Sequence, residues 1–226
     1  MTERSLQAAL GHAFGHAGLL TQALTHRSFG TPHNERLEFV GDSVLNCVVA
    51  RALFRQFPDL DEGSLSRLRA GLVKQDALHK LALGLELGGM LRLGDGELRS
   101  GGAQRPSILA DALEALFGAI FTDAGFDAAA ATVERLYAPL IAAIDPKRAG
   151  KDPKTELQEW LQARRHPLPK YELASVSGEA HAQVFEVHCL LATLSVQTVG
   201  HGASRRAAEQ QAARAALDTI AQVCHD

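Results

Sequence analysis

The pattern of apolar residues changes once along this chain, across the segment Asp145–Asp152, and that change restricts the fold more than any other feature. Before the segment, apolar residues recur at helical spacing, with no alternating strand pattern. The segment itself, DPKRAGKD, is rich in Pro, Gly and charge, as is typical of a linker. The pattern predicts an all-α domain over residues 1–145, a linker over 146–152, and a small α+β domain over 153–226.

The same spacing predicts the individual elements. In the first domain, the long helical stretches are His33–Phe57, Ser64–Val73, Gln75–Leu83, Ser107–Asp123 and Phe126–Ile144. The stretch Gly84–Gly102 is rich in glycine and is expected to be rich in loops. In the second domain, the order α-β-β-β-α is expected from Pro153–Arg164, Tyr171–Val176, Ala182–Leu190, Thr193–Val199 and Ser204–Val223. Ser204 is the expected N-cap of the last helix.

Composition excludes several classes of protein. With 46% hydrophobic and 22% charged residues, the chain is an ordinary globular protein. No run of 18 apolar residues and no signal-peptide pattern are found, so we expect no membrane span and a cytoplasmic location. Cys47, Cys189 and Cys224 lie far apart, which argues against a zinc site, and Cys47 is expected to be a small core residue. The net charge of −3 does not indicate a nucleic-acid partner, so any RNA affinity must come from local patches.

Five carboxylates stand at helical spacing in two of the predicted helices. They are Glu35, Glu38 and Asp42 in NERLEFVGDS, and Asp111 and Glu114 in SILADALEALFGAI. Within each helix they share one strip. Small residues beside the acids, Gly41, Ala115 and Gly118, would let the two helices approach closely. Acids bordered by apolar residues are costly without a cation, and hard oxygen ligands suit Mg²⁺ or Mn²⁺. This pattern predicts metal-dependent chemistry on a phosphate.

Both acidic segments resemble the ribonuclease III family, and the α-β-β-β-α module resembles the double-stranded-RNA-binding domain. The resemblance runs from Phe14 to about Val223. It implies a homodimeric endoribonuclease that cleaves double-stranded RNA and leaves 5′-phosphate and 3′-hydroxyl ends. Mg²⁺ is the implied cofactor, Mn²⁺ its expected substitute, and no organic cofactor is expected. The implied substrates are ribosomal RNA precursors and structured messenger RNA.

The resemblance also implies roles for single residues. Glu38, Asp111 and Glu114 are the expected metal ligands, Asp42 completes the cluster, and Asp42 and Glu114 form the catalytic pair. The position of Glu35 is expected at the dimer contact. Glu62 is expected to reach the partner's site, although a first-turn carboxylate favoured by the helix dipole explains it equally well. In RLGDGE, Asp95 stands where relatives often carry Lys, and Arg99 and Arg105 are possible replacements for that charge.

Three surfaces of the second domain are expected to contact RNA. Double-stranded RNA is recognised through its shape, its phosphates and its 2′-hydroxyls across two minor grooves. The expected contacts are Thr155, Gln158 and Glu159 on the first helix, His181 in a strand-connecting loop, and Arg205 and Arg206 at the start of the last helix. Backbone N–H groups at a helix start already favour phosphate.

Two other functions remain open at this point. A relative that binds structured RNA without cutting it would have lost one or more of the acids, which this chain retains. A metal phosphohydrolase acting on small nucleotides would leave residues 152–223 without a purpose.

Overall fold

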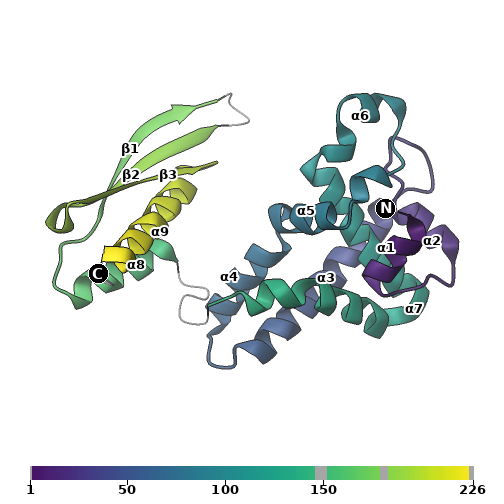
Figure 1. The fold of residues 1–226 in the computed structure, drawn as a ribbon, viewed down its shortest axis with the longest axis horizontal. Helices are drawn as coiled ribbons and strands as arrows, with labels where there is room; N and C mark the ends of the chain where they lie inside the picture. The colour runs from purple at the N-terminus through teal and green to yellow at the C-terminus, as the bar shows by residue number, and fades with distance from the viewer. Residues whose placement is uncertain (1, 146–151, 179–182, 224–226) are drawn as a thin grey trace. The chain divides into compact units, whose positions relative to one another are not determined.

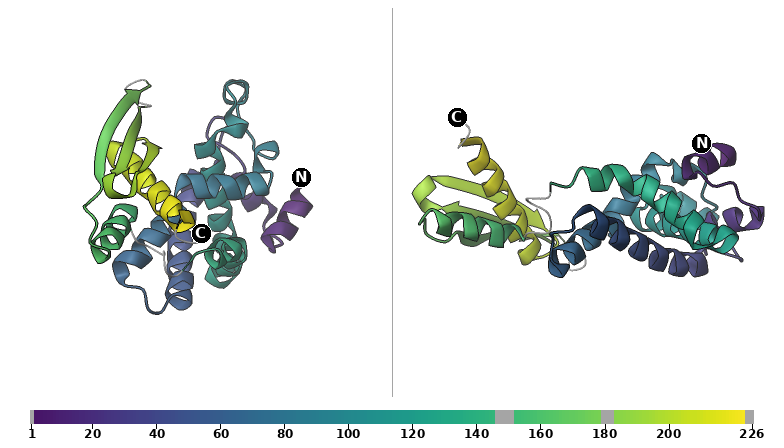
Figure 2. Two further views of the ribbon diagram at one scale, coloured as in Figure 1. Left: turned by 60° about the vertical axis from the view of Figure 1, so that its left-hand side comes forward. Right: turned by 90° about the horizontal axis from the view of Figure 1, so that it is seen from below.

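The computed structural model describes residues 2–145, 152–178 and 183–223, and the chain divides into two compact units, Met1–Gly150 and Lys151–Asp226. The described part of the first unit is helical, and the second is a three-stranded antiparallel sheet with two helices (Figures 1 and 2). This confirms the predicted fold class. None of the helices in the described ranges is long and apolar enough to cross a membrane.

The first unit is assembled around two long helices. Its α-helices are α1 (Glu3–Leu10), α2 (Ala17–Ala23), α3 (Glu35–Gln56), α4 (Glu62–Val73), α5 (Gln75–Gly84), α6 (Asp95–Arg99) and α7 (Pro106–Ala142), with short 3-10 turns at Leu87–Gly89 and Gly102–Gln104. Helices α3 and α7 pack against each other and contribute most of the buried core (Figure 1). Helix α3 buries one stripe of its surface, whereas the first half of α7 is apolar and buried on nearly all sides, as is typical of a central core helix.

Helix α7 is interrupted at Gly125, whose φ of 82° and ψ of −176° are non-helical. Such a conformation is essentially restricted to glycine. The interruption falls between the two helices predicted from the sequence, Ser107–Asp123 and Phe126–Ile144. Asp123, at the end of the first half, accepts hydrogen bonds from the backbone N–H groups of Gly15 (2.9 Å) and His16 (3.0 Å), the residues that precede α2.

The second unit contains α8 (Pro153–Ala163), β1 (Lys170–Ser177), β2 (Val184–Leu191), β3 (Val196–Gly202) and α9 (Arg205–Val223). The sheet order is β1-β2-β3, and α8 and α9 lie beside the sheet (Figure 1). Residues of both helices and of the sheet form one small apolar core. Ser204 Oγ accepts a hydrogen bond from the Ala207 N–H, as expected for the N-cap of α9.

Two predictions from the sequence are wrong, and one short helix was not predicted. Cys47 is exposed, because it lies outside the buried stripe of α3 that includes Leu45, Val48 and Val49. The glycine-rich stretch is mostly loop, as predicted, but it contains the short helix α6, whose residues DGELR follow a glycine cap. A 3-10 turn at Ala192–Leu194 precedes β3, so this strand begins three residues later than predicted.

Candidate active site

The site begins where α3 crosses α7. A β-carbon added at Gly41 would collide with the carbonyl oxygen of Glu114, and one added at Gly118 would collide with that of Leu37. The two backbones therefore meet at a distance that only glycine permits. This confirms the expectation that small residues bring the acidic helices together.

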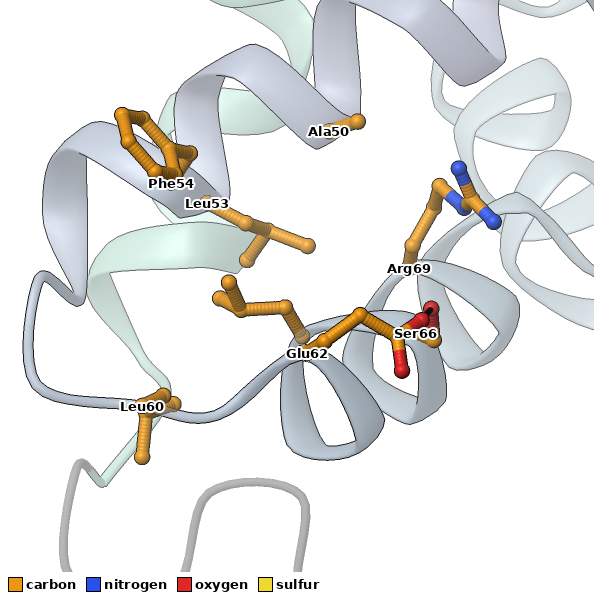
Figure 3. A pocket seen from close by; sticks show the side chains of 8 residues that line it. Ala50, Leu53, Phe54, Leu60, Glu62, Ser66 and Arg69 are labelled. Carbon is orange, nitrogen blue, oxygen red and sulfur yellow. Dashed lines mark hydrogen bonds between the residues drawn. The ribbon is translucent and has the colours of Figure 1, made fainter.

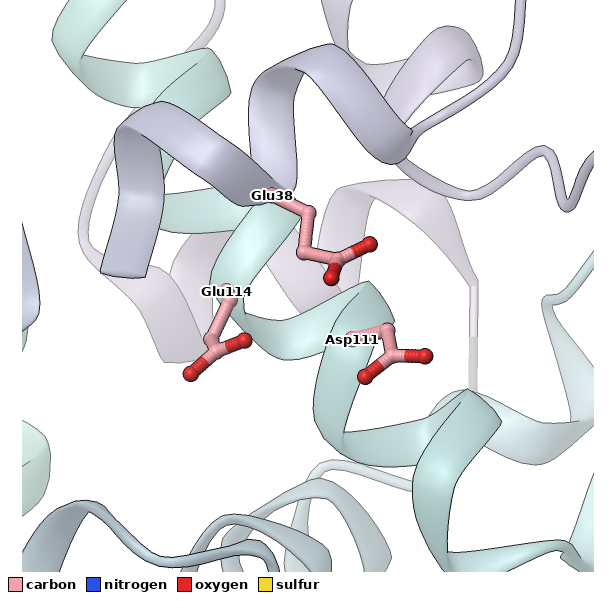
Figure 4. A group of neighbouring side chains, drawn as sticks. All are labelled: Glu38, Asp111 and Glu114. Carbon is pink, nitrogen blue, oxygen red and sulfur yellow. The ribbon is translucent and has the colours of Figure 1, made fainter. Parts of the chain in front are cut away.

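Three carboxylates meet beside this crossing. Glu38 extends from α3 towards Asp111 and Glu114, which stand one turn apart on α7 (Figure 4). One oxygen from each side chain lies within 4.8 Å of the others. All three side chains are half-buried. The helical spacing seen in the sequence thus produces one compact group of oxygens.

Burial and mutual repulsion alter the acidity of this group. Desolvation raises the pKa of Glu114 to about 8, and the charges of Asp42, Glu38 and Asp111 add to the effect. Desolvation, followed by nearby carboxylates, also raises the pKa of Glu38. The pKa of Asp111 is raised by desolvation, although His26 opposes the change. The group therefore lacks the positive charge that would stabilise three ionised carboxylates.

The three carboxylates fit a divalent cation. Within the described ranges, no Lys or Arg forms an ion pair with Glu38, Asp111 or Glu114. Oxygen donors within 4.8 Å of one another suit Mg²⁺ or Mn²⁺. A bound cation would supply the missing charge. The geometry therefore supports all three ligands expected from the sequence.

Asp42 lies one helical turn beyond Glu38 and outside this group of three. It is exposed, and its Oδ1 accepts a hydrogen bond from Asn46 Nδ2 at 2.8 Å. It nevertheless lies close enough to Glu114 to be the strongest charge acting on the pKa of that residue. The structure thus places Asp42 at the edge of the cluster.

Glu35 and Glu62 occupy different surfaces. Glu35 lies near Arg27 (Oε1 to Nη1, 3.4 Å) and lines a polar pocket shared with Glu38 and Asp111. Glu62 is the first residue of α4 and accepts a hydrogen bond from Ser66 Oγ at 2.7 Å. It lines a separate, mainly apolar pocket of about 530 Å³ between α3 and α4 (Figure 3). Glu62 is thus not a member of the acidic cluster of its own chain.

Asp95 is the first residue of α6, where a carboxylate suits the positive end of the helix. Arg99 donates from Nε to the backbone oxygen of Asp95 at 3.2 Å. Arg105 pairs with Glu97 at 2.6 Å and, like Glu38 and Asp111, lines the polar pocket. Of the two arginines considered as replacements for a lysine, Arg105 is the one at the site.

The expected RNA contacts of the second unit are exposed where the structure describes them. Thr155, Gln158 and Glu159 lie on α8, and Arg205 and Arg206 begin α9, while His181 lies outside the described residues. An ion-pair network that joins α8 to α9 beside these residues was not predicted from the sequence and includes Lys154. Its Nζ pairs with Glu209 Oε2 at 2.6 Å, and Glu209 also pairs with Arg205 at 3.0 Å. The position of Lys154 at the start of α8 was the only signal for it.

Sequence reasoning also missed Asn34, which is 2% exposed. Its side-chain Nδ2 has no hydrogen-bond partner among the described residues, and the residue lines the polar pocket. Asn34 stands inside the motif NERLEFVGDS, but nothing in the sequence indicates that its amide is buried beside a pocket.

Comparison with known proteins gives matches over both units of the chain. A family model described as ribonuclease-III-like matches residues 16–141, and the model of the double-stranded RNA binding motif matches residues 153–220. The chain is 65% identical over 216 residues to Ribonuclease 3 of Thiobacillus denitrificans, covering 96% of each chain. It is 59% identical over 220 residues to Ribonuclease 3 of Dechloromonas aromatica, covering 97% of this chain and 99% of the other.

Among solved structures, the nuclease domain of ribonuclease III from Campylobacter jejuni superimposes with a TM-score of 0.61 at 43% identity. The match covers 64% of this chain and 99% of that domain. A second structure of the Campylobacter jejuni domain gives a TM-score of 0.59 at 44% identity, covering 61% and 97%, and its description refers to a region involved in dimer formation.

Proposed function

The chain belongs to the ribonuclease III family and is an endoribonuclease of double-stranded RNA; we propose that it uses Mg²⁺ bound by Glu38, Asp111 and Glu114 and works as a homodimer. The observation that carries the metal proposal is the convergence of three carboxylates from α3 and α7 within 4.8 Å. Mn²⁺ is expected to substitute, because it accepts the same oxygen ligands. No organic cofactor is required for this hydrolysis.

In this proposal each carboxylate has a distinct task. Glu38 of α3 and Asp111 and Glu114 of α7 would hold the cation. A bound divalent cation lowers the pKa of a coordinated water and stabilises charge on the phosphate. Asp42 and Glu114 form the catalytic pair, with Asp42 at the exposed edge of the cluster, where it can orient a water or accept its proton. Cleavage leaves a 5′-phosphate and a 3′-hydroxyl.

We assign residues 1–145 to the nuclease module, 146–152 to the linker and 153–226 to the RNA-binding module. The matched ranges 16–141 and 153–220 support this division. In the second module, we assign minor-groove contacts to the exposed residues Thr155, Gln158 and Glu159 and to His181, and phosphate contacts to Arg205 and Arg206. The exposure of the two arginines at the start of a 19-residue helix supports the phosphate assignment.

The homodimer proposal is supported by apolar exposure on α3. Phe39 is 77% exposed and Phe54 is 70% exposed, although the opposite stripe of the same helix lies in the core. Exposed aromatic side chains on one helix mark an association surface. Phe54 and Glu62 also line the apolar pocket between α3 and α4 (Figure 3). A second copy on this face would bring Glu62 towards the partner's cluster and place Glu35 near the contact.

This dimer can be tested by light scattering coupled to size exclusion. Phe39→Asp should yield a monomer, and Leu98→Asp, at another exposed apolar side chain, should leave the dimer intact. A dimer that survives the Phe39 substitution would place the interface elsewhere. The proposed substrates are ribosomal RNA precursors and structured messenger RNA, and the proposed location is the cytoplasm.

The catalytic proposal is tested with a long RNA duplex. The wild-type protein should cleave it in Mg²⁺ and not in EDTA. Glu114→Gln should lose at least about a hundredfold in rate, and it should still bind the duplex in Ca²⁺. Asp76→Asn, at an exposed carboxylate on α5, is the matched control and should cleave normally. Unchanged cleavage by Glu114→Gln would remove the proposed site, and binding without any cleavage by the wild type would favour a non-cleaving RNA-binding protein.

A further inference from the structure

A polar pocket of about 450 Å³ lies directly beside the acidic cluster. Glu38 and Asp111 line this pocket as well as the cluster, and the rest of its wall includes Arg27, Asn34 and Arg105. A polymer with one phosphate at the cluster can therefore extend past these two carboxylates into the pocket. We call this space the Asn34 pocket.

Asn34 has an unused hydrogen-bond donor in this pocket. Its backbone is fully engaged: the N–H donates to Thr25 O at 2.9 Å, and its carbonyl accepts from the N–H groups of Leu37 and Glu38. Its side chain is 2% exposed, and Nδ2 has no partner within the described part of the chain. Buried amide donors are nearly always paired, so an acceptor in the pocket would satisfy this one.

Two helices also begin at the Asn34 pocket. Asn34 precedes α3 and Arg105 precedes α7, and neither side chain caps its helix. Ser107 and Ile108, in the first turn of α7, line the same space. Uncapped backbone N–H groups and the positive ends of both helix dipoles favour an anion there.

The charges around the pocket restrict what that anion can be. Arg27 pairs with Glu35 at 3.4 Å and Arg105 with Glu97 at 2.6 Å, so these pairs nearly neutralise one another. A guanidinium carries five N–H donors, and Glu97 and Ser100 engage two of those of Arg105. Glu38 and Asp111 would repel a small free anion. A nucleic-acid strand brings a neighbouring phosphate to the metal-neutralised cluster, so the strand fits better than an isolated ion.

We propose that the Asn34 pocket binds the backbone phosphate adjacent to the scissile phosphate, with the Asn34 amide and the Arg105 guanidinium as its donors. The inference rests on the proposed nuclease function and adds to it two residues that hold the cut strand in register. Binding of this neighbouring phosphate fixes which phosphate lies over the three carboxylates.

Neutral phosphates provide the test. Two duplex RNAs are made, each with a single methylphosphonate, one on the 5′ side of the scissile phosphate and one on its 3′ side. Each is compared with a duplex that has the same 2′-deoxy nucleotide and a normal phosphate. For the wild type, one position should reduce kcat/KM by roughly tenfold or more, as expected for a lost hydrogen bond to a charged group. In Asn34→Ala, and in Arg105→Gln, the same modification should cause a much smaller further loss.

A matched variant separates contact from structure. Gln22 Nε2 donates to the backbone oxygen of His33 at 3.0 Å, so Gln22→Ala loosens the segment that carries Asn34 without removing its amide. It should keep the full methylphosphonate penalty. Arg105 is exposed, so Arg105→Gln is available if Asn34→Ala does not fold.

The proposal would be overturned if, at both phosphates, the methylphosphonate reduced kcat/KM by the same factor in Asn34→Ala and Arg105→Gln as in the wild type. It would also be overturned if the Gln22→Ala protein behaved like Asn34→Ala. These outcomes are distinct from a failure of the proposed function. In that case the wild-type protein would not cleave even the unmodified duplex in Mg²⁺.

Discussion

Gly41 of α3 and Gly118 of α7 face each other where the two helices cross, and neither position has room for a β-carbon. A β-carbon at Gly41 would come within 2.9 Å of the Gly118 backbone nitrogen, and one at Gly118 within 3.0 Å of the Gly41 nitrogen. The crossing lies between Glu38 on one helix and Glu114 on the other. The distance between Glu38 and Glu114, two of the proposed metal ligands, is therefore set by the absence of two side chains.

Gly41→Ala should destabilise the protein by about 1–3 kcal/mol, because the helices must separate to admit the methyl group. It should also weaken Mg²⁺ binding, since Glu38 moves away from Asp111 and Glu114. Urea unfolding and metal titration measure the two effects. Gly71→Ala, at an exposed position of α4 with no atom within 4 Å, is the control and should leave stability unchanged or slightly raised. Equal stability of the two variants would contradict this account.

The stability of the metal-free protein should fall as pH rises from about 5 to about 8. Burial raises the pKa of Glu114 to about 8, so the folded protein keeps a proton that the unfolded chain loses at the lower, ordinary pKa. The free energy of unfolding decreases with rising pH wherever the folded state binds more protons than the unfolded state. Mg²⁺ bound at the proposed site would displace this proton, so its stabilising effect should grow over the same pH range.

Melting temperatures in EDTA and in Mg²⁺ at several pH values measure this dependence. Glu114→Gln has no titrating carboxyl at this position, and its melting temperature in EDTA should vary less with pH. Parallel curves for the wild type and Glu114→Gln would show that another group is responsible.

Asp123→Asn should destabilise the first unit by about 2–3 kcal/mol at neutral pH. The Asp123 side chain is 3% exposed, and it accepts hydrogen bonds from Gly15, His16 and the His12 ring. These bonds hold the pKa of Asp123 well below its ordinary value, although burial opposes them. The stabilisation is present above the unfolded-state pKa and is lost as pH falls through the folded-state pKa, so the variant and the wild type should converge in acid. Asp127→Asn, at an exposed position of α7, should show no such effect in urea unfolding.

Arg206→Gln should weaken binding to double-stranded RNA and reduce the slope of log Kd against log salt by roughly one unit, as expected for the loss of one phosphate contact. Arg214→Gln removes the same charge from the same helix, but Arg214 pairs with Glu156 at 3.0 Å. Its salt slope should match that of the wild type. Identical slopes for Arg206→Gln and the wild type would exclude a phosphate contact at this residue.

Helical periodicity was sufficient to place Asp111 and Glu114 on one face of α7, because 3.6 residues per turn fixes which side chains share a face. That Glu38 of α3 meets them was expected from the small residues on both helices and from the family resemblance. Gly41 and Gly118 indicated the close crossing. Periodicity could not show that the Asn34 amide finds no partner among the described residues, because that depends on the three-dimensional surroundings of the residue, including α7 and Arg105 across the pocket. Periodicity also could not predict that Cys47 and Phe39 are exposed, because an apolar residue type does not show whether the side chain lies in the core or on a contact surface.

Glu114 and Asp123 lie nine residues apart on the same uninterrupted half of α7, and the hydrogen bonds of Asp123 anchor the end of that half. Inserting or deleting one residue between them would rotate the carboxylate by about 100° relative to the anchored end. Over evolutionary time the residues between Glu114 and Asp123 can be substituted far more freely than their number can change.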